Sequence, residues 1–115
     1  MGFWKGLFGA RPAANPDDSV TVHFTLSDKK FGSSEERDRV HRFSHELAAL
    51  IQECQVGEFD GDEFGNGEGT LFMYGPDADR LFEAVLSALK TWEPLRGGHV
   101  IKRYGKLGRS ERIDF

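Results

Sequence analysis

The chain has 115 residues, of which 38% are hydrophobic and 30% charged, which is enough apolar material for one domain with its own core. A net charge of −4, from 15 basic and 19 acidic residues, argues against a general nucleic-acid binder. The single cysteine excludes an internal disulfide framework and a metal site built from several cysteines. No apolar run approaches the length of about 20 residues that spans a bilayer.

Residues 1–16 form a segment of their own, and 17–115 the predicted domain. Two prolines disfavour helix at the end of the segment, so we expect an extended linker there. The segment could cover its own domain, dock on a partner, or lie at a membrane interface, where a single short segment binds only weakly. Its interaction residues are large and apolar: Phe3, Trp4, Leu7 and Phe8.

The next two elements follow from periodicity. Apolar and polar residues alternate from Ser19 to Ser27, which predicts a half-buried strand. Ser33 and Glu36 have the spacing of a capping box, and the apolar stripe behind them predicts a helix from about Ser34 to Glu53. The stripe ends at Cys54, which we expect to be a small buried hydrophobe.

A glycine-rich stretch then predicts a hairpin, with 56–64 pairing with 69–74 around the Gly65–Gly67 turn. Pro76 is placed like the first-turn proline of a second amphipathic helix, which ends before Pro94. Residues 99–104 form a further strand, and 111–115 could add a short last one.

This order predicts an α+β domain, namely a ferredoxin-like β-α-β-β-α-β sandwich. Both helices would cover one face of an antiparallel sheet, and the other face would stay open. The second strand of such a sheet is an edge strand, and the basic C-terminal strands would lie on the opposite side.

Two motifs carry a resemblance. Residues 57–65 read GEFDGDEFG, and residues 74–79 read YGPDAD. The chain resembles, over about 20–104, small bacterial proteins with a GEFDGxEFGxG segment followed by a YGPDAD segment. The resemblance implies a cytoplasmic single-domain protein and implies no activity.

The first motif is strongly acidic. In a regular strand Glu58, Asp60 and Asp62 would stand in a row at intervals of about 7 Å, next to Glu63. One interpretation is a site for a divalent cation or a cationic partner, with His23 from the neighbouring polar face. The interpretation that we prefer is protection of a sheet edge, because charged side chains block pairing with other chains.

Other chemistry lacks support in the sequence. His41 and His45 are four apart but point away from the apolar stripe, so we expect a solvated helix face. The third strand lacks the basic residue of an RNA-recognition motif, and no phosphate-binding loop is present. We therefore expect no catalytic residues, no metal and no cofactor.

The sequence thus favours a non-enzymatic binding or protein-interaction module that meets a protein partner or a second copy in a homodimer, with no nucleic acid. The alternative is a divalent-cation-dependent binder or small enzyme that uses the acidic strand 58–63.

Overall fold

The computed structural model describes residues 18–105 and 108–115. The interaction segment predicted at Phe3, Trp4, Leu7 and Phe8 lies outside the described residues, as does the start of the predicted domain at residue 17. The elements, in chain order, are β1 (Asp18–Thr25), α2 (Ser34–Cys54), β2 (Glu58–Gly65), β3 (Glu68–Gly75), α3 (Ala78–Thr91), the short 3-10 helix η2 (Glu93–Leu95), β4 (His99–Arg103) and β5 (Ser110–Asp114).

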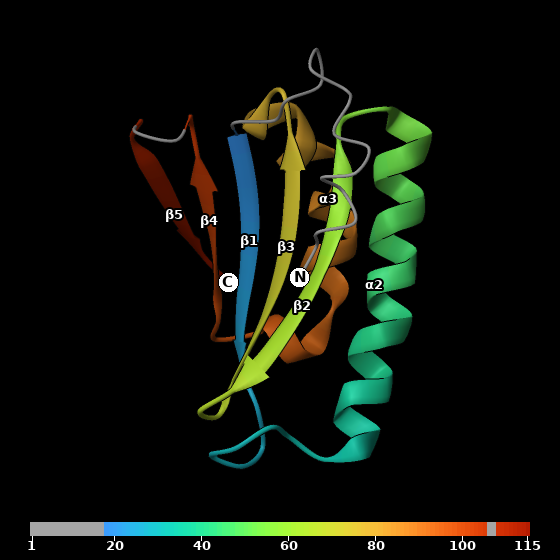
Figure 1. Cartoon of the computed structure of the whole chain (residues 1–115), viewed down its shortest axis with the longest axis vertical. Coiled ribbons are helices and arrows are strands. Elements are labelled where there is room, and N and C mark those ends of the chain that lie inside the picture. The colour runs from blue at the N-terminus through green and yellow to red at the C-terminus, as the bar shows by residue number, and fades with distance from the viewer. Residues whose placement is uncertain (1–17, 106–107) are drawn as a thin grey trace.

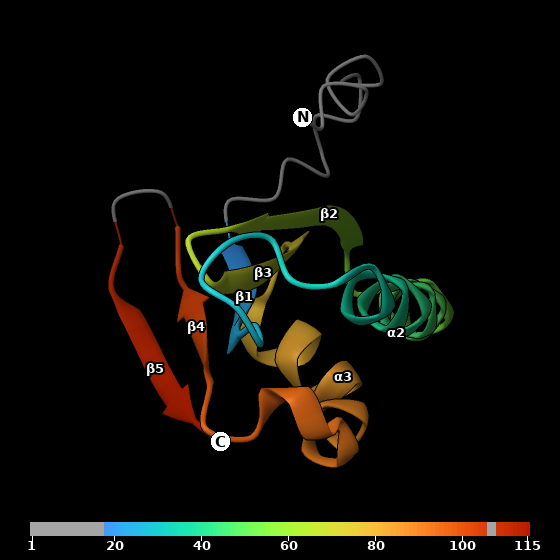
Figure 2. The ribbon, with the colours of Figure 1, turned by 90° about the horizontal axis from the view of Figure 1, so that it is seen from below.

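The strands form one antiparallel sheet in the order β2-β3-β1-β4-β5 (Figure 1). Figure 2 shows both helices on the same side of this curved sheet. The predicted α+β class, with two helices and an antiparallel sheet, is confirmed. The sheet is not a plain four-stranded ferredoxin-like layer, because β5 extends it beyond β4 and η2 separates α3 from β4.

The caps explain where the helices begin. The Ser33 side chain accepts from the Glu36 backbone N–H, and the Glu36 carboxylate accepts from the Ser33 N–H, so the predicted capping box is present. At α3 the Asp77 carboxylate accepts from the N–H groups of Asp79 and Arg80. Asp18 accepts at 2.9 Å from both the Ala78 and Gly105 N–H groups, which ties β1 to the start of α3 and the end of β4.

The core lies between the helices and the sheet. Trp92, at the end of α3, stacks on Phe43 of α2 with centroids 4.1 Å apart and meets Phe24 of β1 edge-on at 5.0 Å. The side chains with no exposed surface include Val20, Val22, Leu47, Leu71, Met73, Leu81, Val85 and Val100.

Cys54, however, is exposed. The expectation of a buried Cys54 is wrong because burial in α2 stops at Ile51 and resumes at Val56, after the left-handed Gln55.

None of the helices in the described ranges is long and apolar enough to cross a membrane.

Candidate interaction surface

The face of the sheet opposite the helices, here called the open face, follows from strand alternation. In β1 the side chains of Val20, Val22 and Phe24 are buried under the helices. The intervening Thr21 and His23 therefore point to the open face, where they are partly exposed. Their neighbours across the ladders share this face.

The pairing registers arrange the open face in three rows that run across all five strands, from β2 to β5. The middle row is the most apolar and is Gly61, Phe72, Thr21, Ile101 and Arg112. The rows on its two sides are Glu58, Tyr74, Ser19, Arg103 and Ser110, and Glu63, Thr70, His23, His99 and Asp114.

Three large side chains therefore lie outside the core, close to the centre of the open face. Phe72 and Tyr74 come from β3 and Ile101 from β4, and all three are partly exposed. A cluster of partly exposed aromatic and aliphatic side chains on one sheet face is typical of a binding surface.

Two histidines stack beside this cluster. His23 of β1 and His99 of β4 are directly paired across the ladder, with ring centroids 4.7 Å apart and planes inclined by 12°. The Thr21 hydroxyl lies 2.9 Å from His23 Nε2, which fixes the ring.

The environment of His23 disfavours its charged form. Its pKa is lowered from 6.5, first by burial and then by the positive charge that His99 can carry. Glu68 acts in the opposite direction, and Arg112 adds to the lowering. The predicted site residue His23 thus lies on the open face, where its surroundings disfavour the charged form of the ring.

The charged side chains are distributed unequally along the rows. Glu58 and Glu63 lie at the β2 ends, whereas Arg103 lies on β4 and Arg112 lies on β5 beside Asp114, with which it pairs. The open face therefore has an acidic side at β2, an apolar centre, and an opposite side where Arg103 adds positive charge next to the Arg112–Asp114 pair.

The prediction that Glu58, Asp60 and Asp62 stand in one row along β2 is wrong. A bulge shifts the register between Phe59, opposite Met73, and Gly61, opposite Phe72, and Asp60 is the extra residue. Gly61 has φ +131°, a backbone conformation that residues with a side chain rarely adopt. Past the bulge the alternation is inverted, so Glu58 and Glu63 lie on the open face, and Asp62 opposes the buried Leu71.

The inversion brings Asp62 to α2. Its carboxylate lies 3.4 Å from His41 Nε2, and the His41 ring meets Phe64 edge-on at 6.2 Å. His41 is still 55% exposed, in agreement with a solvated helix face, while Asp62 is 23% exposed. The edge strand is held against the helix by these contacts.

The acidic residues are consequently divided between two faces. In the described part of the chain, no group of three or more histidine, cysteine, aspartate or glutamate side chains is placed to hold a metal ion. Glu58, Asp60, Asp62 and Glu63 therefore do not form one cluster with His23.

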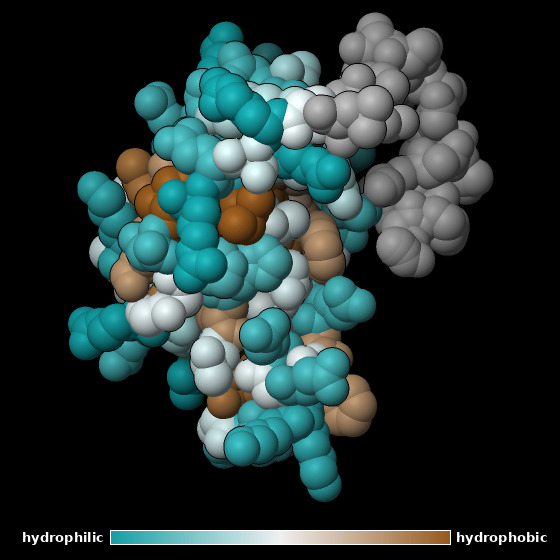
Figure 3. Space-filling view, turned by 90° about the vertical axis from the view of Figure 1, so that its left-hand side faces the viewer, coloured by the Kyte–Doolittle hydropathy of each residue, from teal (hydrophilic) through white to brown (hydrophobic). Residues whose placement is uncertain are grey.

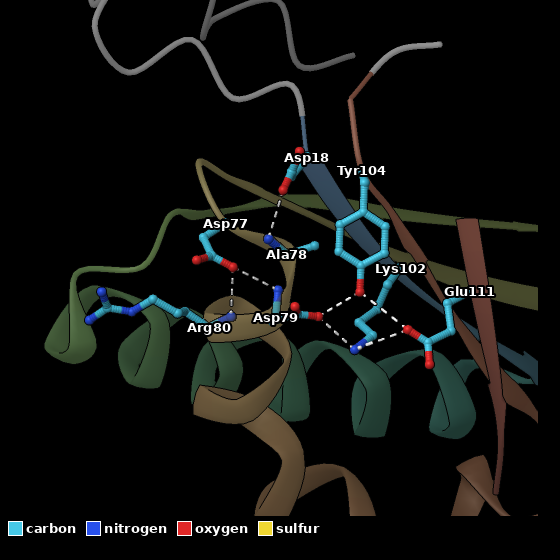
Figure 4. Close-up of polar contacts among 8 residues, drawn as sticks. All are labelled: Asp18, Asp77, Ala78, Asp79, Arg80, Lys102, Tyr104 and Glu111. Carbon is cyan, nitrogen blue, oxygen red and sulfur yellow. Dashed lines mark hydrogen bonds and ion pairs between the residues drawn. The ribbon is translucent and has the colours of Figure 1, made fainter. Parts of the chain in front are cut away.

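A polar cluster on the helix side anchors the basic strands (Figure 4). Lys102 of β4 is buried beside the Phe82 ring, and its ammonium donates to Asp79 Oδ1 at 2.8 Å and lies 3.5 Å from Glu111 of β5. The Tyr104 hydroxyl lies 2.5 Å from Asp79 Oδ1 and 3.2 Å from Glu111 Oε1. The cluster joins the start of α3 to both β4 and β5.

Electrostatics give this cluster a structural role. Burial alone lowers the pKa of Lys102, but its hydrogen bonds with Asp79 and Tyr104 outweigh burial and raise the pKa. The same two bonds, from Lys102 and Tyr104, lower the pKa of Asp79. Lys102 therefore stays protonated and cannot serve as a nucleophile or base near pH 7.

The side of the molecule that carries β5 and β4 is shown in Figure 3. Hydrophilic side chains cover most of this view, and a hydrophobic patch in its upper half is interrupted by them. In β5 four of the five residues are exposed, and Arg112 Nε donates to Asp114 Oδ1 at 2.8 Å.

Comparisons of the chain with protein-family models, curated proteins and solved structures gave no match.

We did not expect His99, Phe72 or Ile101 to be surface residues from the sequence alone. The signal was available, because His99, Ile101 and Arg103 alternate with Val100 and Lys102 in the last strand. The bulge also left a trace. Phe59 and Phe64 are five apart, and both pack against the core, which requires one extra residue between them.

Proposed function

We propose that the protein is a non-enzymatic interaction module that binds a protein partner through the open face of its sheet. The observation that carries this proposal is the middle row of the open face, in which Phe72 and Ile101 lie outside the core on either side of Thr21.

We infer that the scaffold is a ferredoxin-like sandwich extended by β5, because the first four strands have the order β2-β3-β1-β4 and both helices lie on one face. A cytoplasmic setting and kinship with the GEFDGxEFGxG proteins belong to the same proposal.

The charges of the open face specify the partner. A complementary segment has apolar side chains at its centre, basic residues facing Glu58 and Glu63, and an acidic residue facing Arg103. An acidic side next to β2 is unfavourable for a phosphate backbone, so a protein fits better than a nucleic acid.

The experiment compares affinity capture by the tagged full-length chain and by two open-face variants, Phe72→Ser and Ile101→Ser. Both replacements remove apolar surface that is outside the core, so we expect the fold to survive, which circular dichroism checks. Phe31→Ser is the matched control, because Phe31 is 59% exposed and precedes α2.

We expect the wild type and Phe31→Ser to retain a partner that both open-face variants lose. A set of captured proteins that is the same for all four chains, or that Phe31→Ser also loses, would contradict the proposal.

A further inference from the structure

The outer edge of β5 presents main-chain groups that can pair with another strand. The Tyr104 N–H donates to the Arg109 carbonyl, and the Phe115 N–H donates to the Gly98 carbonyl. Since hydrogen-bonding direction alternates along a strand, the odd-numbered residues of β5 face β4. The N–H and C=O groups of Ser110, Arg112 and Asp114 therefore point outward, and β5 ends the sheet within the described residues.

The side chains of Arg112 and Asp114 complement each other in an antiparallel pair of identical strands. Both lie on the open face, and they are 59% and 73% exposed. When Ile113 lies opposite Ile113 of a second copy, Arg112 lies opposite Asp114 of that copy, and Asp114 opposite its Arg112. Two cross-strand ion pairs then form on one face, with the two isoleucines in contact on the other.

The two adjacent two-fold registers lack this complementarity. An axis through residue 112 places two arginines opposite each other, and an axis through Glu111 places two glutamates there. Like charges directly opposite destabilise a strand pair. In the register centred on Ile113 the outward groups of Arg112 and Asp114 are aligned, so that the two copies share about four main-chain hydrogen bonds.

We propose that β5 binds β5 of a second copy of this chain in the register centred on Ile113, which makes one continuous ten-stranded sheet. The two-fold axis is then perpendicular to the sheet, and both open faces lie on the same side. This association uses the β5 edge of the sheet and does not require Phe72, Tyr74 or Ile101 at the centre of the open face.

The contact is short, which sets the expected affinity. Pairing of two five-residue strands buries less surface than the roughly 1,200 Å² of a stable interface. We therefore expect a reversible dimer with a dissociation constant on the order of 10–100 µM.

The test exchanges the charges. Arg112→Asp places acid opposite acid, and Asp114→Arg places base opposite base, so neither variant can form the pairs with itself. A mixture of the two variants restores both pairs between unlike chains, as does the double variant Arg112→Asp/Asp114→Arg with itself. Arg42→Asp and Glu46→Arg, two exposed residues of α2, are the matched controls for charge.

Sedimentation equilibrium of the full chain from about 10 to 500 µM gives the readout. We expect dimer formation by the wild type, both controls, the double variant and the mixture, and at least a tenfold weaker association of each single variant alone. A wild type that stays monomeric, single variants that still dimerise, or a mixture that stays monomeric would overturn the proposal. Affinity capture by Phe72→Ser is independent of this result, so the two proposals can fail separately.

Discussion

The two edges of the sheet, β2 and β5, differ in whether a further strand can pair with them. The β2 edge is interrupted by the bulge at Asp60, carries acidic side chains, and is held against α2 through Asp62 and His41. The β5 edge has a regular ladder with β4. It also carries Arg112 and Asp114, which complement Asp114 and Arg112 of a second copy. Bulges and unbalanced charge block edge pairing, whereas a regular edge with balanced charge permits it. We therefore call β2 the closed edge, because a further strand cannot pair with it, and β5 the pairing edge, because a further strand can.

The largest expected effect concerns the closed edge and the strand that supports it. An added Cβ at Gly69, in β3, would lie 2.4 Å from the Phe24 ring, so Gly69→Ala must displace a buried aromatic. We expect it to lower the free energy of unfolding by about 2–3 kcal/mol. Gly65→Ala is the control, because nothing lies within 4 Å of a Cβ there. Chemical denaturation measures both, and equal effects would contradict the packing described for β3.

The next effect opens the closed edge. Deletion of Asp60 removes the extra residue of the bulge, yet leaves Phe59 and Phe64 on the core side, because their separation becomes even. We expect a change in the free energy of unfolding of less than about 1 kcal/mol and a new association through β2, seen as species larger than a dimer in sedimentation. Unchanged association would show that the bulge does not protect this edge.

A smaller effect tests the polar cluster around Lys102, which joins the start of α3 to β4 and β5. The pKa of Asp79 is lowered from 3.8, so its contribution to stability is present above that pH and is lost as the pH falls through the lowered value. We expect Asp79→Asn to be less stable than the wild type at pH 7, and this difference to be smaller at pH 2. Urea denaturation at both values measures this, and a difference that is independent of pH would contradict the ion pair with Lys102.

The smallest effect is on the pKa of His23, which responds to charged side chains on both sides of the open face. Glu68 raises the pKa of His23 and Arg112 lowers it. We expect Glu68→Gln to lower that pKa further and Arg112→Gln to raise it, as followed by NMR titration of the ring protons. Shifts of the same sign in both variants would contradict the placement of His23 between the two charged sides.

The sequence was sufficient for the elements whose pattern is strictly periodic. The alternation over 19–27, the capping box at Ser33 and the apolar stripe of the first helix all correspond to observed structure. The position of β2 at an edge was predicted as well.

Features that depend on an irregularity were not predictable in the same way. A single extra residue, Asp60, inverts the rest of β2, so a strict alternation assigned Asp62 to the wrong face. Lys102 occupies a buried position in β4, and only the three-dimensional approach of Asp79 and Glu111 explains why a charge is tolerated there. Partner side chains of this kind come from distant positions in the chain, which periodicity does not relate.

The most direct test of the difference between the edges is disulfide trapping at the β5 edge. Ile113→Cys places two thiols across the two-fold axis at a non-hydrogen-bonded pair, where the Cα separation of about 4.5 Å suits a disulfide. Ser110→Cys is the register control, because it leaves the Arg112–Asp114 pairs intact but places the two thiols far apart in the register centred on Ile113, and both variants carry Cys54→Ala because the native thiol is exposed. We predict rapid formation of a covalent dimer by Ile113→Cys under mild oxidation and little by Ser110→Cys. Equal cross-linking of the two variants, or none with Ile113→Cys, would contradict the account.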